Sequence, residues 1–178
     1  MKRWTDKLVA LGACPDAVEW ARAYPSLTAA WKVCERADWM LWLAGKLCRT
    51  VPARKRLVLA ACACARTALK YVPKGEGRPL VAIQTAERWA RGTHGVTLDD
   101  VHVSADAAGV AAGVAAGAAA YAAWAAAYAA WPAAYAAWPA AGAAAYAVSA
   151  AARIKASARM SNIIRKHYPN PPRQGRRR

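Results

Sequence analysis

The sequence predicts an all-α protein, a helical bundle joined to a long alanine-rich helix or helical hairpin. Three observations predict this class. No segment alternates apolar and polar residues as a strand does, and residues that start helices recur before apolar stretches. In addition, 30 of the 48 residues 105–152 are alanine, the residue with the highest helix propensity. The hydrophobic content of 57% excludes a disordered polar chain, and 11 glycines without a triplet period exclude collagen.

The first part of the chain contains a series of short predicted helices. Ser26 and Asp38 are expected to cap helices, Pro52 and Pro79 to lie in first turns, and Gly92 to end a helix. The expected ranges are 6–12, 15–23, 27–36, 39–48, 52–71 and 79–91. The segment 39–48 is apolar nearly all round, which places it at the centre of the predicted core.

The alanine-rich region carries aromatic residues at heptad spacing. Three of its tyrosines, Tyr121, Tyr128 and Tyr135, are spaced seven residues apart, and a tryptophan lies three residues after each of these. Such a stripe on one helix face requires a partner surface, so we expect a partner-binding or packing role for its members. They are Tyr121, Trp124, Tyr128, Trp131, Tyr135 and Trp138.

The same region contains no charged residue from 107 to 152, and two prolines interrupt it. Pro132 and Pro139 favour a kink or a break, so the expected helices are 97–131 and 143–167. An uncharged rod of this length must fold back as a hairpin, associate with a second copy or enter lipid. The central position of the aromatic residues argues against a membrane span.

Positive charge concentrates in two parts of the chain, residues 49–56 and residues 153–178. Lys and Arg total 26 against 10 Asp and Glu, and the formal net charge is +16. This balance is typical of nucleic-acid binders, although a solvated basic face and a solubilising tail give the same composition. The candidate phosphate-contacting residues are Arg49, Arg54, Lys55, Arg56, Arg165, Lys166, Arg173, Arg176, Arg177 and Arg178.

No catalytic, metal-binding or cofactor-binding motif is present in the sequence. Cys62 and Cys64 are two apart on a predicted helix and point to different faces, so they cannot share a metal. Glu87 is expected to pair with Arg91 one helical turn later. The absence of a secretory signal and the five cysteines without a disulfide pattern predict a reducing, cytoplasmic location.

These features divide the chain into three expected units. Residues 1–96 form an N-terminal helical bundle, residues 97–167 form an alanine-rich helical region that packs on it, and residues 168–178 form a disordered basic tail.

Several separated blocks resemble one group of proteins. DWMLWLAG (38–45), RLVLAACACAR (56–66), GRPLVAIQTAERWARG (77–92) and IIRKHYPNPP (163–172) occur in this order. Together they resemble small helical proteins of bacteria and their phages of the immunity-protein type. The resemblance covers most of residues 14–172 and implies an all-helical domain without enzymatic activity that neutralises an effector by binding it. The two Trp-Pro steps and the basic tail depart from that pattern.

Three functions therefore compete. The preferred hypothesis is a non-enzymatic, immunity-like binding protein that captures a protein partner stoichiometrically. The first alternative is a nucleic-acid-associated basic protein. The second is a self-assembling or membrane-associated alanine-rich protein.

Overall fold

The computed structural model describes residues 3–67, 69–72, 74–104, 106 and 150–172, and within these residues the fold is all-α, without strands. The elements are α1 (Asp6–Ala10), α2 (Pro15–Arg22), α3 (Leu27–Val33), α4 (Ala37–Leu47), α5 (Val51–Arg66), the 3-10 turn η1 (Leu69–Tyr71), α6 (Arg78–Arg91) and α10 (Ala150–His167). Residues 98–104 are also helical.

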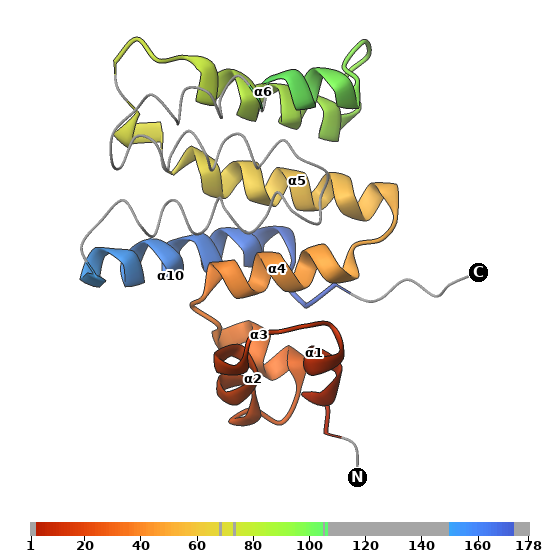
Figure 1. Cartoon of the computed structure of the whole chain (residues 1–178), viewed down its shortest axis with the longest axis vertical. Coiled ribbons are helices and arrows are strands. Elements are labelled where there is room, and N and C mark those ends of the chain that lie inside the picture. Colours follow the sequence, from red (N-terminus) through yellow and green to blue (C-terminus); the bar gives the residue numbers. More distant parts are fainter. Residues whose placement is uncertain (1–2, 68, 73, 105, 107–149, 173–178) are drawn as a thin grey trace.

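The helices are stacked in layers (Figure 1). The short helices α1–α3 form one end, α4 and α10 lie next to them, and α5 and then α6 follow toward the other end. Helix α5 contacts α4, α6 and α10, and α10 also contacts α4. The last described helix therefore packs beside α4 and against α5, which precede it by about a hundred residues.

Two apolar clusters use opposite sides of α5. One cluster joins α1–α4 to Leu57, Ala60 and Cys64 of α5 and to the end of α10. The other joins α5 to α6 and to Val101. Cys62 belongs to the second cluster and Cys64 to the first, which confirms that these two thiols point to different faces.

Local signals set several helix ends as expected. The Ser26 side chain accepts a hydrogen bond of 3.2 Å from the Ala29 amide at the start of α3. Gly92 follows α6 with φ 76°, a left-handed conformation that a glycine adopts without a steric penalty. The Thr97 hydroxyl accepts from the Asp100 amide at 3.2 Å while Asp100 accepts from the Thr97 amide at 2.8 Å, a reciprocal cap for the helix over 98–104.

Two predictions about helix boundaries are wrong. Asp38 lies inside α4 and does not cap it, because its carboxylate is paired with the Arg36 side chain. The Thr50 side chain caps the start of α5. This helix ends at Arg66, whereas the sequence predicts that it continues to residue 71.

The chain is packed at residue 168, the expected first residue of the basic tail. Tyr168 is only 6% exposed and packs in the first cluster, so an ordered, packed chain continues past residue 168.

Helix α10 anchors α3 and the α3–α4 turn. Ser157 donates to the Glu35 carbonyl at 2.6 Å and accepts from the Ala37 amide at 3.1 Å. Arg165 donates to the Cys34 carbonyl at 2.7 Å, which satisfies an acceptor at the C-terminus of α3. The position of α3, and of the tryptophans beside it, therefore depends on α10.

Candidate functional site

An apolar hollow lies at the end of the molecule formed by α1–α4. Four half-buried tryptophans surround it: Trp4, Trp20, Trp39 and Trp42. Trp31, Met40 and Leu43, which are buried, also line it. The cavity volume is about 50 Å³, enough for a few water molecules or the branched end of an aliphatic side chain.

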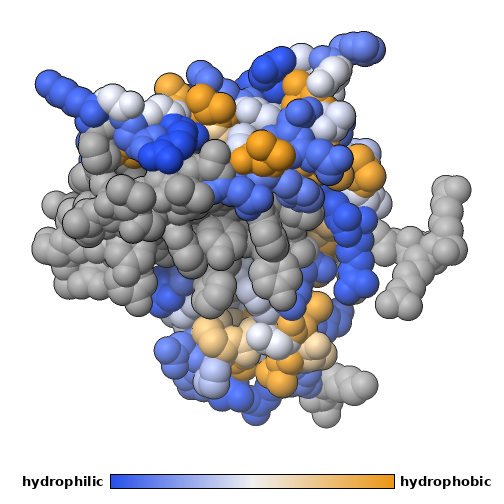
Figure 2. Space-filling view, turned by 45° about the horizontal axis from the view of Figure 1, so that its top comes forward, coloured by the Kyte–Doolittle hydropathy of each residue, from blue (hydrophilic) through white to orange (hydrophobic). Residues whose placement is uncertain are grey.

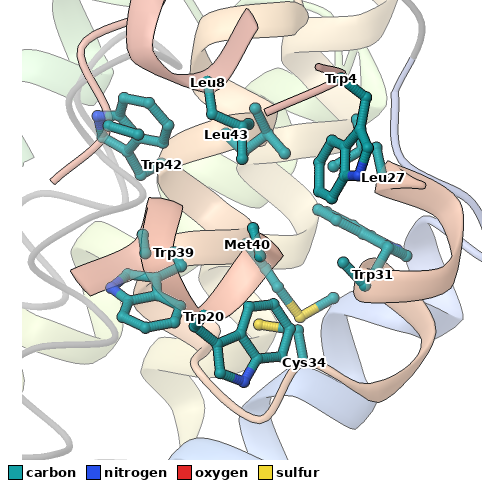
Figure 3. Close-up of a pocket in the computed structure, with 14 residues that line it drawn as sticks. Trp4, Leu8, Trp20, Leu27, Trp31, Cys34, Trp39, Met40, Trp42 and Leu43 are labelled. Atoms are coloured by element: carbon teal, nitrogen blue, oxygen red, sulfur yellow. The ribbon is translucent and has the colours of Figure 1, made fainter. Parts of the chain in front are cut away.

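The four half-buried rings come from three parts of the chain, since Trp4 precedes α1, Trp20 belongs to α2 and the other two belong to α4 (Figure 3). The ring centroids of Trp20 and Trp39 are 5.7 Å apart at an interplanar angle of 57°, which joins α2 to α4. Trp20 also lies 4.7 Å from the Tyr24 ring. The indole nitrogen of Trp4 donates to the Tyr24 carbonyl at 2.9 Å. These contacts hold large, rigid side chains at the rim before any ligand binds.

Two cations lie against rim rings. The Arg36 guanidinium is 4.2 Å from the centroid of the Trp39 ring, and the Lys46 ammonium is 5.7 Å from that of Trp42. Arg36 also pairs with Asp38 at 2.6 Å. The hollow therefore combines an apolar interior with charged groups at its margin, which is the usual composition of a protein-binding surface.

Cys34 contributes a neutral group to the lining. Burial raises the pKa of its thiol to about 11, so it is protonated at neutral pH. A protonated thiol behaves as a small apolar group and a poor nucleophile. The lining of this hollow is therefore apolar at neutral pH, and its thiol is a poor nucleophile.

Figure 2 shows where apolar residues reach the surface. Hydrophobic groups gather over the α1–α3 end and are surrounded there by hydrophilic residues. Val9 and Val33 of this end are 59% and 52% exposed. These two exposed valines belong to α1 and α3 and do not line the apolar hollow.

The structure brings three of the predicted basic residues together. Lys55 and Arg56 of α5 and Lys166 of α10 line one open hollow of about 600 Å³. His167 lines the same hollow, although the sequence did not identify it as a candidate site residue. We call these four residues, with Pro52, Leu59 and Ala90, the basic hollow.

The other predicted basic residues lie elsewhere. Arg49 and Arg54 are exposed but do not line the basic hollow. Arg165 points inward, since its guanidinium donates to the carbonyls of Trp31 at 3.3 Å and Cys34 at 2.7 Å. The remaining candidates, Arg173, Arg176, Arg177 and Arg178, lie outside the described residues.

The aromatic stripe also lies outside the described residues, so its partner-binding role stays a prediction. This applies to Tyr121, Trp124, Tyr128, Trp131, Tyr135 and Trp138. The tryptophans of the apolar hollow were missed as a site. One signal could have found them: five of the nine tryptophans of the chain occur in its first 42 residues. However, so many tryptophans at helical spacing are also typical of an ordinary hydrophobic core.

Among the helices that the structure describes, none combines the length and the apolar character that crossing a bilayer requires. Comparison of the chain with protein-family models, with curated proteins and with solved structures gives no match.

Proposed function

We propose that this chain is a non-enzymatic binding protein that captures a protein partner stoichiometrically, in the manner that its immunity-like sequence blocks imply. The observation that supports the proposal is the apolar hollow, in which four half-buried tryptophans surround a small cavity. Tryptophan is favoured at the centre of interfaces because it gives a large contact area with few rotatable bonds.

The chemistry of the hollow defines the partner. Its small volume and apolar lining suit the end of one aliphatic or aromatic side chain that projects from the partner. The net charge of +16 attracts an acidic partner over long range, and Lys46 beside Trp42 offers a contact for a carboxylate close to the anchor. The partner is therefore an acidic protein that presents an apolar residue between carboxylates.

A defined peptide tests this proposal. Peptides with one apolar residue flanked by Asp and Glu are selected from a displayed library against the full chain, and the tightest is synthesised. Its dissociation constant is measured by fluorescence anisotropy for the wild type and for Trp39→Ala. Loss of a ring at an interface centre costs about 2 kcal/mol or more, which weakens binding about thirtyfold.

Trp89→Ala is the matched control, because Trp89 is a half-buried tryptophan that does not line the apolar hollow. Its dissociation constant should stay within about twofold of the wild type, since distant sites act independently. Equal losses in the two variants, or a selected peptide that Trp39→Ala binds as well as the wild type does, would contradict the proposal.

The alternative of self-assembly or membrane association depends on the alanine-rich segment. Residues 107–149 lie outside the described residues, and this alternative stays a prediction. Size exclusion with light scattering distinguishes it, because a monomer that remains wholly in the soluble fraction excludes both forms of association.

A further inference from the structure

We propose that the basic hollow between α5 and α10 is a second binding site and that it takes the phosphodiester backbone of a single-stranded nucleic acid. This site is separate from the apolar hollow, and it does not depend on the capture of a protein partner.

The placement of the charges is the first argument. Pro52, Lys55, Arg56 and Leu59 follow one another at the spacing of one α5 face, and Lys166 and His167 approach that face from the end of α10. More than a hundred residues separate the two groups in sequence. The packing of α10 on α5 therefore concentrates three permanent positive charges around one open hollow.

Opposite charge is missing from the lining. None of the residues of the basic hollow is acidic. The sequence contains no Asp or Glu between Arg49 and Gly75 or in α10. On α6, the adjacent Glu87 pairs with Arg66 at 2.7 Å and with Arg91 at 3.3 Å. The cations of the hollow thus attract an external anion without competition from a carboxylate in its lining.

Two of the cations are held in place by aromatic rings. The Lys55 ammonium lies 5.5 Å from the centroid of the Trp89 ring, and the Arg56 guanidinium lies 5.9 Å from that of Tyr168. Tyr168 is buried, so its ring is a firm support. Side chains that are already ordered lose less conformational entropy when they bind a phosphate.

A second hollow continues the first. Arg56 and Pro52 also line a hollow of about 480 Å³ that extends along Tyr168 to Pro172. The two share a boundary at Arg56, so an extended polymer can follow both of them. A flexible single strand can follow such a path, whereas a stiff duplex or a flat bilayer cannot bend along it. This shape favours a single strand over both.

The expected salt dependence follows from the number of charges. Burial and the nearby Arg56 lower the pKa of His167, which leaves it neutral at pH 7. Lys55, Arg56 and Lys166 remain as three cations, and for single strands each neutralised phosphate contributes about −0.7 to the slope of log K against log salt. The slope should therefore be about −2, and raising the salt from about 50 to 200 mM should weaken binding about twentyfold.

The experiment titrates a fluorescein-labelled oligothymidylate of about 20 nucleotides with the full chain at several salt concentrations. Each phosphate contact adds about fivefold to affinity near 100 mM salt, so the triple variant K55Q/R56Q/K166Q should bind about a hundredfold more weakly. The matched control is K7Q/K32Q/K74Q, which removes three charges from exposed positions outside the hollow and should keep most of the affinity. Far-UV circular dichroism and thermal melting establish that both variants are folded.

Equal affinities for the two triple variants, or a slope near zero, would overturn the proposal. Two further measurements, vesicle binding and competition by polyglutamate, identify other ligands. Binding to phosphatidylserine vesicles but not to the oligonucleotide would assign the hollow to a membrane surface, and equally strong competition by polyglutamate would assign it to an acidic protein. Either result overturns the nucleic-acid proposal, and neither bears on the apolar hollow, which Trp39→Ala tests separately.

Discussion

The indole nitrogen of Trp31 donates a hydrogen bond of 2.9 Å to the backbone carbonyl of Tyr168, 137 residues later in the chain. Trp31 is 2% exposed and lines the apolar hollow, and Tyr168 is 6% exposed and lies beside the basic hollow. One buried contact therefore links the two candidate sites to the same packed core.

The Tyr168 hydroxyl should contribute to stability. It donates to the Ala53 carbonyl at 3.0 Å and lies 3.5 Å from the Cys48 sulfur. Tyr168→Phe leaves that carbonyl without its donor, and we expect the free energy of unfolding to fall by about 1 kcal/mol. Urea denaturation measures the change, with Tyr24→Phe as a control because Tyr24 is half-buried and packs through its ring. Equal stability of Tyr168→Phe and the wild type would show that the hydroxyl is not bonded.

Adjacent basic residues on α10 should have opposite effects on stability and binding. Arg165 donates to two carbonyls at the end of α3, whereas Lys166 is exposed at the basic hollow. Arg165→Gln should lower the free energy of unfolding by about 2 kcal/mol, since charged hydrogen bonds to partly buried carbonyls are lost. Lys166→Gln should leave unfolding unchanged and weaken oligonucleotide binding. Thermal melting and anisotropy on both variants test the assignment, and the reverse pattern would refute it.

The ion pairs of Glu87 should make stability depend on acid pH. The Arg66 guanidinium beside Glu87, together with Arg91, holds the pKa of this carboxyl below its ordinary value of 4.5. A lowered folded-state pKa stabilises the fold above pH 4.5, and that contribution disappears as the pH falls through the lowered pKa. Glu87→Gln should therefore cost about 1 kcal/mol at pH 7, a modest value because Arg66 is partly exposed and solvent screens the pair, and progressively less as the pH falls below 4.5.

Urea denaturation of the wild type and Glu87→Gln across this pH range measures the difference. Glu19→Gln is the control, since Glu19 and Arg22 form an exposed pair on α2 and the substitution should change stability little at any pH. A constant difference between the wild type and Glu87→Gln from pH 7 to pH 2 would show that the pair does not stabilise the fold.

The buried thiols should make stability depend on alkaline pH. Burial raises the pKa of Cys64 from 9.0 to about 12, and burial also raises the pKa of Cys62. Above pH 9 these thiols ionise in the unfolded chain but stay neutral in the folded one, so stability falls as the pH rises. Between about pH 7 and 10 each thiol should account for a loss of about 1 kcal/mol.

Cys62→Ala/Cys64→Ala should show a weaker loss than the wild type over the same range, as measured by urea denaturation. A thiol reagent provides a second measurement. In the folded protein it should label Cys14 rapidly, because Cys14 is exposed, and it should label Cys34, Cys48, Cys62 and Cys64 only on unfolding. Rapid labelling of all five cysteines at pH 8 would contradict the packing of α5.

Local sequence signals predicted the helices well. Ser26, Pro79 and Gly92 act on backbone groups within one turn, so their effects do not depend on the rest of the fold. Asp38 was misassigned because the side chain of Arg36 competes for its carboxylate. The end of α5 was misplaced because the backbone tightens into η1 after Arg66, although the apolar pattern continues.

The candidate sites were harder to predict because both depend on contacts between distant segments. The basic residues of α5 and α10 were recognised, but the sequence could not separate Arg165, which packs inward, from Lys166, which lies at the basic hollow. The tail was expected to begin at Tyr168 because proline and arginine follow it, whereas burial of its ring outweighs that composition. The tryptophans form a rim only after α2 and α4 pack together.

The most direct test of the central claim uses the indole N–H signals of the nine tryptophans in a nitrogen-15 correlation spectrum of the full chain. On addition of the selected acidic peptide, we predict that the signals of Trp20, Trp39 and Trp42 shift in proportion to occupancy while that of Trp89 stays in place. Shifts confined to Trp89, or a spectrum that does not change at saturating peptide, would contradict the assignment of the apolar hollow as the partner-binding surface.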